Sequence, residues 1–237
     1  MRNLIFVLLF LAVCTPAWCG TPSPVFTSGL AKFKAGDYKA AITYYNDAIT
    51  QEPDVNYYYY HRANAKYKLN DLAGAISDLN TSIGLEVTAD ALYLRGLCNT
   101  ISHNYTAASA DLEQAYELRP DQKTTCFYLG VDYYFLSKHT EAISMFDKAV
   151  YIDRYYYDAY LFRGLSKFSQ GKKDEGIKDV LQCLSIKGDY PQAMFELAKM
   201  YWETRELDLC KSFLDMAIEL KPNFQDAMDF RSKNFAE

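Results

Sequence analysis

The chain has 237 residues, of which 50% are hydrophobic and 23% are charged, enough to bury a core for one or two domains. It carries 25 Lys and Arg against 30 Asp and Glu, a formal net charge of −5. This acidic balance argues against a nucleic-acid binder, which needs a basic face to displace the counterions of the phosphate backbone. Tyr is frequent, at 21 residues, whereas Gly (11) and Pro (7) are too scarce for a loop-rich or fibrous protein. The composition therefore predicts helices and a surplus of aromatic surface.

Residues 1–20 have the pattern of a secretory signal peptide. A basic residue precedes an apolar run over residues 4–13, and Ala17 and Cys19 are small residues after which cleavage is expected. The apolar run is about ten residues long, against about 20 for a membrane-spanning helix, so we expect no transmembrane span in the mature chain. The sequence predicts an exported protein, periplasmic or secreted. The alternative is a lipid anchor on Cys14, although the residue before this cysteine is bulkier than usual.

A repeat of about 34 residues runs through the rest of the chain. The repeats span residues 22–55, 56–88, 89–122, 123–156, 157–190 and 191–224. Positions 8, 20 and 27 of the repeat hold only small residues (Gly, Ala, Ser or Cys), and position 24 is large and apolar in all six. Small residues let two helices approach closely, and large ones fill the space between them. Repeats of this length indicate a solenoid.

Each repeat divides into two helical patterns. The division falls near the middle of the repeat, as at residues 35–37. Ser23 followed by Pro24 predicts the N-cap and the first residue of the first helix. Pro53 and Pro120, at position 32, predict where second helices end. The repeat unit is therefore expected to be a helix-turn-helix.

The period and the residue types at these repeat positions resemble the tetratricopeptide repeat (TPR) family over 203 of the 237 residues. The resemblance implies an all-α, right-handed TPR superhelical solenoid of six helix-turn-helix repeats within residues 21–224. Its first helices would line a concave groove, and its second helices would form the outer face. Residues 225–237 continue the pattern for one more helix, and we expect this segment to be a capping helix that keeps the last repeat soluble.

Charged residues at positions 7 and 23 match each other from repeat to repeat. Arg occupies position 7 in the second, third and fifth repeats, and in those alone position 23 is Asp. The pairs are Arg62 with Asp78, Arg95 with Asp111, and Arg163 with Asp179. We expect each pair to meet across its helical hairpin as a structural ion pair. The alternative is that the three aligned Arg hold an acidic ligand.

A second stripe on the first helices is rich in aromatic residues. Positions 2, 5, 9 and 12 lie together on one helix face because they are spaced by three, four and three residues, and in the resembled family this face lines the groove. The candidate partner-binding residues on it are Tyr57, Tyr60, Asn64, Tyr67, Tyr93, Leu97, Phe127, Val131, Tyr134, Leu161, Leu165, Phe168, Phe195, Lys199 and Trp202. Aromatic rings offer rigid contact area, and Tyr hydroxyls can bond a peptide backbone. The alternative is that these rings pack between adjacent first helices.

The groove lacks the residues that other TPR domains use to hold acidic tails. The carboxylate clamps of the resembled family carry Lys, Asn and Arg at positions 5 and 9, whereas here only Asn64 and Lys199 are polar at those positions. We therefore expect an apolar or aromatic-containing protein segment as ligand.

Residues with catalytic or metal-binding chemistry are scattered. The three His are isolated, and the four Cys that remain after cleavage are spaced neither like a metal site nor like a disulfide framework. No nucleophile elbow, phosphate loop or dinucleotide fingerprint occurs. We expect small buried thiols, no metal, no cofactor and no enzymatic activity.

The sequence thus predicts a non-catalytic protein–protein interaction module. It would bind a peptide or helical segment of a partner in its aromatic-lined concave groove. The alternative is a structural or scaffold subunit of a cell-envelope assembly that acts through self-association. The oligomeric state is open at this point.

Overall fold

The computed structural model describes residues 23–235, and in this range the chain forms 13 α-helices and no strand. The first helices of the repeats are α1 (Pro24–Lys34), α3 (Asn56–Lys68), α5 (Ala89–Ile101), α7 (Lys123–Phe135), α9 (Tyr157–Ser169) and α11 (Pro191–Thr204). The second helices are α2 (Tyr38–Gln51), α4 (Leu72–Leu85), α6 (Tyr105–Leu118), α8 (His139–Ile152), α10 (Lys173–Ile186) and α12 (Leu207–Leu220). The last helix is α13 (Gln225–Asn234). The predicted signal peptide lies outside the described residues.

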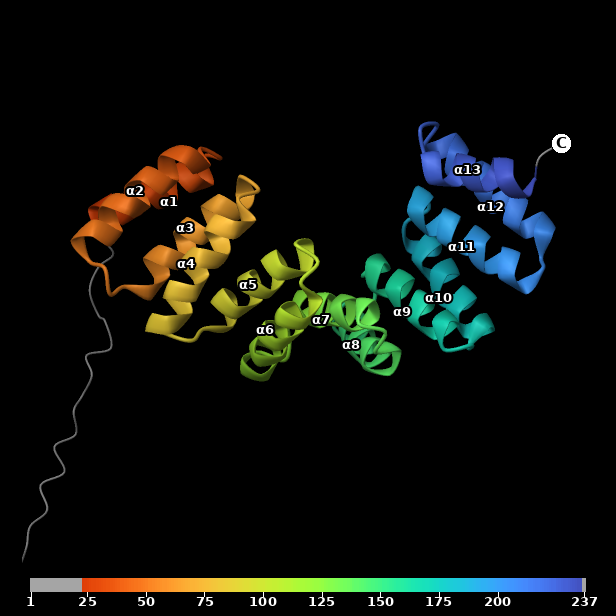
Figure 1. The fold of residues 1–237 in the computed structure, drawn as a ribbon, viewed down its shortest axis with the longest axis horizontal. Helices are drawn as coiled ribbons and strands as arrows, with labels where there is room; N and C mark the ends of the chain where they lie inside the picture. Colours follow the sequence, from red (N-terminus) through yellow and green to blue (C-terminus); the bar gives the residue numbers. More distant parts are fainter. Residues whose placement is uncertain (1–22, 236–237) are drawn as a thin grey trace, which may run out of the picture.

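The six hairpins follow one another along an arc (Figure 1). Each first helix packs against its own second helix, and each second helix packs against the first helix of the next repeat. The prediction of an all-α superhelical solenoid with six repeats and a capping helix is confirmed. In such a solenoid each repeat contacts mainly its neighbours, so the fold is held together by a series of similar interfaces.

Side chains and turns fix the ends of the helices. Ser23 accepts a hydrogen bond from the Phe26 amide (3.1 Å), and Pro24 begins α1 as predicted. Every hairpin reverses at repeat position 15, whose residue has a positive φ between 58° and 81°. These residues are Gly36, Asn70, His103, Ser137, Gly171 and Arg205. This left-handed conformation is free of strain only for glycine, so four of the six turns carry a conformational cost.

The core lies between the two helices of each hairpin. Position 20 is buried in all six repeats, and so is the large apolar residue at position 24. A Cβ placed on Gly130, at position 8, would lie only 2.6 Å from Cε1 of Phe146, at position 24. The small-residue columns are therefore explained by close helix approach, as their pattern predicts.

Candidate functional site

Three ion pairs join the helices of the second, third and fifth repeats. In each, Arg Nη2 lies 2.6 Å from Asp Oδ1, and Nε lies 2.8 or 2.9 Å from Oδ2. The pairs are Arg62 with Asp78, Arg95 with Asp111, and Arg163 with Asp179. All three carboxylates are buried. These are bidentate hydrogen bonds, the strongest arrangement for an Arg and a carboxylate.

Each of these Arg also reaches back to the preceding repeat. Its Nη1 donates to the side chain at position 25 of the preceding second helix. The contacts are Arg62 to Asn46 (2.7 Å), Arg95 to Asn80 (2.9 Å) and Arg163 to Asp147 (2.7 Å). Arg231 of α13 contacts Asp215 of α12 in the same register, at 3.2 Å. The first three guanidinium groups therefore tie consecutive repeats together and have their donors directed at partners within the chain.

The candidate partner-binding residues divide into two groups by burial. Five are buried, with at most 8% of their surface exposed: Leu97, Phe127, Val131, Leu161 and Phe195. Ten are half-buried: Tyr57, Tyr60, Asn64, Tyr67, Tyr93, Tyr134, Leu165, Phe168, Lys199 and Trp202. The first group contributes to the core. The second group is only partly covered and can contact a ligand without a rearrangement of the helices.

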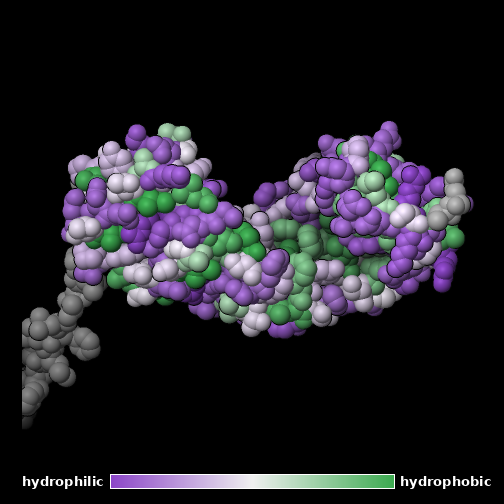
Figure 2. Space-filling view, turned by 45° about the horizontal axis from the view of Figure 1, so that its top comes forward, coloured by the Kyte–Doolittle hydropathy of each residue, from purple (hydrophilic) through white to green (hydrophobic). Residues whose placement is uncertain are grey.

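The space-filling view shows where this surface lies. Figure 2 shows a hollow between the two arms of the arc, with hydrophobic residues gathered in it and hydrophilic residues over the outer faces. The two arms are the N-terminal and C-terminal repeats of Figure 1. In this view, hydrophobic residues are accessible on the concave side of the solenoid.

The capping helix covers the C-terminal end of the aromatic stripe. The ring of Phe230 lies 5.8 Å from that of Phe195 and 5.9 Å from that of Trp202, and Phe235 lies 5.6 Å from Trp202. At the other end, Tyr57 packs edge-on against Phe26 at 5.0 Å. Part of the stripe therefore packs between neighbouring first helices.

A pocket of about 180 Å³ opens in the groove between α7, α9 and α11. Its lining includes four candidate residues, Tyr134, Leu165, Phe168 and Lys199, together with Ser169, Glu196, Met200 and Glu203. Lys199 forms an ion pair with Glu196, with Nζ 2.6 Å from Oε2. Burial, and then the charge of Glu196, raise the pKa of Tyr134, so its hydroxyl stays protonated at neutral pH. The pocket offers aromatic and aliphatic walls with polar groups at its edge, as ligand sites commonly do.

The acidic residues of this pocket were not predicted. Glu196 and Glu203 occupy repeat positions 6 and 13, which flank the stripe on the same side of the helix. Position 13 follows position 9 by four residues, so the helical periodicity that defined the stripe also leads to Glu203.

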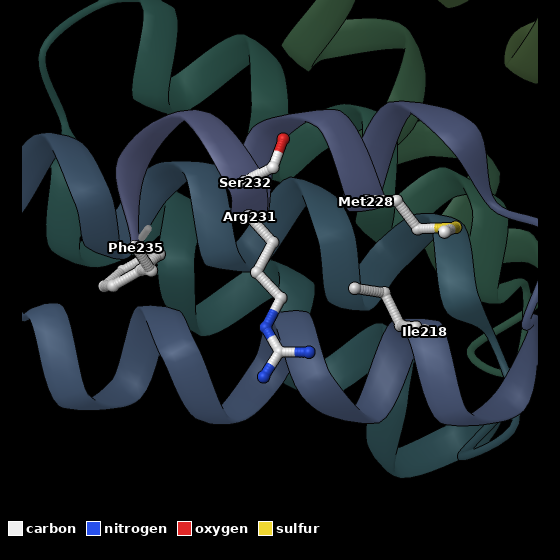
Figure 3. A pocket seen from close by; sticks show the side chains of 5 residues that line it. All are labelled: Ile218, Met228, Arg231, Ser232 and Phe235. Carbon is white, nitrogen blue, oxygen red and sulfur yellow. The ribbon is translucent and has the colours of Figure 1, made fainter. Parts of the chain in front are cut away.

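A second pocket lies at the C-terminal end of the solenoid. Figure 3 shows Met228 of α13 and Ile218 of α12 close together, with Arg231 extending toward α12 and Ser232 pointing away from it. The charge of Arg231 faces Asp215 at 3.2 Å. This pocket has few convergent polar groups, so we place the candidate site in the groove.

A buried carboxylate outside the predicted stripe lies between α5 and α7. Asp132 is fully buried; its Oδ1 accepts a hydrogen bond from Thr100 Oγ1 (2.9 Å), while its Oδ2 has no partner among residues 23–235. Burial raises the pKa of Asp132 to about 7, against the lowering effect of the Thr100 hydrogen bond. Asp132 is at repeat position 10, where the other repeats have Ala, Cys, Ser or Met. A charged residue at this position was the signal in the sequence that could have identified Asp132.

Among residues 23–235, the remaining reactive side chains form no metal-binding cluster. Cys98, Cys126, Cys183 and Cys210 are free and buried, and burial raises the pKa of Cys98 to about 11. In the part of the chain that the structure describes, no three His, Cys, Asp or Glu come together as metal ligands. No helix in that part is both long and apolar enough to cross a membrane.

The stacked hairpins and the groove define a helical-repeat protein. Models of the tetratricopeptide repeat match residues 26–85, and also residues 89–122, 157–190 and 191–224. The chain belongs to the tetratricopeptide repeat family, whose members are generally non-catalytic interaction modules.

Similar proteins support the same family. The chain is 33% identical over 99 residues to tetratricopeptide repeat protein 37 of Xenopus laevis, covering 40% of this chain and 6% of that protein. It is 29% identical over 143 residues to tetratricopeptide repeat protein 13 of Homo sapiens, covering 58% and 17%. The chain thus spans less than a fifth of the length of these relatives. Among solved structures, YrrB, described as a TPR protein with an unusual peptide-binding site, has a TM-score of 0.66 and 19% identity, covering 79% of this chain and 97% of YrrB.

Proposed function

We propose that this chain binds an apolar, aromatic-containing segment of a partner protein along its concave groove. The observation that carries the proposal is the pocket between α7, α9 and α11, which Tyr134, Leu165 and Phe168 line together with polar side chains. Half-buried Tyr side chains such as Tyr67 extend the same surface toward the N-terminal repeats. Tyr combines a large contact area with a hydroxyl that can bond a peptide backbone, at low cost in side-chain entropy.

Two further observations support a peptide ligand that is not an acidic tail. YrrB, which is similar in fold, is described as having a peptide-binding site. The three aligned Arg of this chain are already bonded to Asp and Asn side chains within the fold. An acidic tail held by these Arg would have to displace those contacts, whereas an apolar segment only covers surface that water now contacts.

A peptide selection tests the proposal. Random 12-residue peptides on phage are selected against residues 21–237, and the enriched peptides are synthesised and titrated by calorimetry. The double variant Tyr67→Ala, Tyr134→Ala should weaken their binding by about tenfold or more, the loss typical of aromatic anchors. The matched control is Tyr151→Ala on α8, which removes a 90% exposed Tyr from a second helix and should leave the affinity within about twofold.

Equal affinity for the parent and the groove variant would place the binding elsewhere and refute the proposal. Circular dichroism of each variant excludes unfolding as the cause of a loss. Light scattering on the same samples addresses the alternative of self-association. Tyr151, Ile152 and Tyr155, at and just after the end of α8, are exposed, and a stable oligomer lost in Tyr151→Ala would favour that function.

Export is the second part of the proposal. It rests on the apolar run over residues 4–13 and the small residues that follow. Expression of the full chain with its own N-terminus should release a protein whose N-terminal sequence begins after Ala17 or Cys19. A protein that keeps Met1 inside the cell would refute export and leave the groove proposal intact.

A further inference from the structure

The C-terminal ends of the six first helices form a row at the rim of the groove. Repeat position 13 lies four residues after position 9, and therefore one turn further along the same helix face. The residues in the row are Lys34, Lys68, Ile101, Phe135, Ser169 and Glu203, and all six are exposed. A segment bound along the groove would pass these side chains in order.

Charges in this row are segregated by sign. Lys34 and Lys68 lie at the N-terminal end and Glu203 at the C-terminal end. Within residues 23–235 none of the three forms an ion pair, although Lys66 and Lys199 nearby each pair with a carboxylate. The three charges can therefore meet a ligand without first breaking a salt bridge.

The middle of the row is apolar. Ile101 is 41% exposed and Phe135 is 49% exposed, and their helices α5 and α7 contact each other. Phe135 stacks on Tyr105 with ring centroids 4.6 Å apart, which holds its ring in place. Ile101 and Phe135 are consecutive in the row, so its middle offers two large apolar side chains to a ligand.

At the acidic end the row meets the groove pocket. Glu203 and Glu196 both line that pocket, and Lys199 is already paired with Glu196 at 2.6 Å. The carboxylate of Glu203 is thus left uncompensated beside apolar walls. A Lys or Arg of a ligand, whose long apolar stem can lie on Tyr134 and Leu165 while its charge meets Glu203, suits this end.

We propose that the groove binds an extended segment in one charge register. Acidic residues of the ligand lie against α1 and α3, apolar residues against α5 and α7, and a basic residue against α11. This inference rests on the proposed function, because it specifies the ligand of the same groove.

For a ligand of about 12 residues, the length of the row requires an extended conformation. Packed helices lie about 10 Å apart, so the four steps from α3 to α11 cover about 40 Å. An extended chain of about 12 residues spans this distance at about 3.3 Å per residue, whereas a helix of the same length covers only about 18 Å. An extended segment of about 12 residues therefore reaches from Lys68 on α3 to Glu203 on α11, and about 15 residues reach Lys34 on α1 as well.

Charge reversal at each end tests the register by the same phage selection. One variant carries Lys34→Glu with Lys68→Glu, and a second carries Glu203→Lys. Two controls reverse exposed charges on second helices, Lys39→Glu on α2 and Glu117→Lys on α6. The parent should enrich peptides with acidic and basic residues at opposite ends of an apolar centre.

Each variant should change the selected peptides at one end only. The Lys34→Glu, Lys68→Glu variant should enrich peptides that are basic at both ends, and Glu203→Lys should enrich peptides that are acidic at both ends. The best parental peptide should bind each variant about fivefold or more weakly, as expected for reversing exposed charges, and the controls as tightly as the parent.

The possible outcomes separate the two proposals. Enriched peptides that need Tyr67 and Tyr134 but show no charge segregation, or whose charges do not follow the reversals, would overturn the register and leave the proposed function standing. If no enriched peptide depends on those Tyr, the proposed function itself fails. Segregated charges that follow both reversals establish the register.

Discussion

Replacing Asp132 by Asn should stabilise the protein at alkaline pH and leave it nearly unchanged at acid pH. Asp132 is fully buried, and one of its oxygens has no hydrogen-bond partner among residues 23–235. Ionisation therefore places an uncompensated charge in the solenoid core, and this is why burial raises the pKa of Asp132 to about 7 from an ordinary value of 3.8.

The sign and the size of this pH-dependent change in stability follow from the linkage between proton binding and folding. Because the pKa is higher in the folded state, the stability contributed by the protonated group is fully present below about pH 3.8 and is lost as the pH rises through about 7. A shift of about three pH units corresponds to about 4 kcal/mol. The advantage of Asp132→Asn over the parent should thus grow by about 4 kcal/mol between pH 4 and pH 8.

Urea unfolding at a series of pH values measures this difference from the midpoint and the m-value. Titration of other groups occurs in both proteins and cancels when the two curves are subtracted. Asp54→Asn, in the exposed loop before α3, is the control and should show no such growth. A stability difference for Asp132→Asn that stays constant across this pH range would show that the carboxylate is not desolvated, and the reasoning would be wrong.

Three further changes test other parts of the account. Asp111→Ala should cost about 3 to 5 kcal/mol in denaturant melts because it leaves Arg95 without the carboxylate that binds two of its nitrogens, and a loss below about 1 kcal/mol would show that the pair contributes like an exposed one. Burial lowers the pKa of His61 to about 4, so neutral His61 contributes about 3 kcal/mol to the stability above pH 6.5, and this contribution is lost as the pH falls to about 4. His61→Phe should remove this acid-induced loss of stability. An unchanged dependence of stability on pH would contradict the assignment. Ser137→Gly should raise the free energy of unfolding by about 1 kcal/mol, because Ser137 has a φ of 58°, and destabilisation by this change would indicate that the turn is not strained.

The repeat architecture could be predicted from the sequence because its signals are local and occur six times. Columns of small residues at positions 8 and 20 specify close helix packing whatever the details of the neighbours, as the contact between Gly130 and Phe146 illustrates. The Arg95 to Asp111 pairing was also accessible, since charge at position 7 varied together with charge at position 23. The additional bond from Arg95 to Asn80 was not, because it crosses between repeats and depends on the angle at which consecutive hairpins stack.

The sequence allowed us to predict which helix face carries the site, but not which residues on that face are exposed. Helical periodicity identified the stripe, yet it carries no information on how closely adjacent first helices approach. Leu161 and Leu165 belong to the same stripe of α9, but Leu161 is buried and Leu165 is half-buried. Asp132 was missed for a related reason, since a single charged residue at a repeat position that is otherwise uncharged becomes meaningful only when its burial is known.

The most direct test of the central claim is a methyl NMR titration of residues 21–237 with the tightest peptide from the parental selection. Binding in the groove should shift the methyl signals of Leu165 and Ile101 on the first helices and leave those of Leu181 and Leu209 on the second helices unchanged. Shifts confined to Leu181 and Leu209 would place the ligand on the outer face and contradict the account.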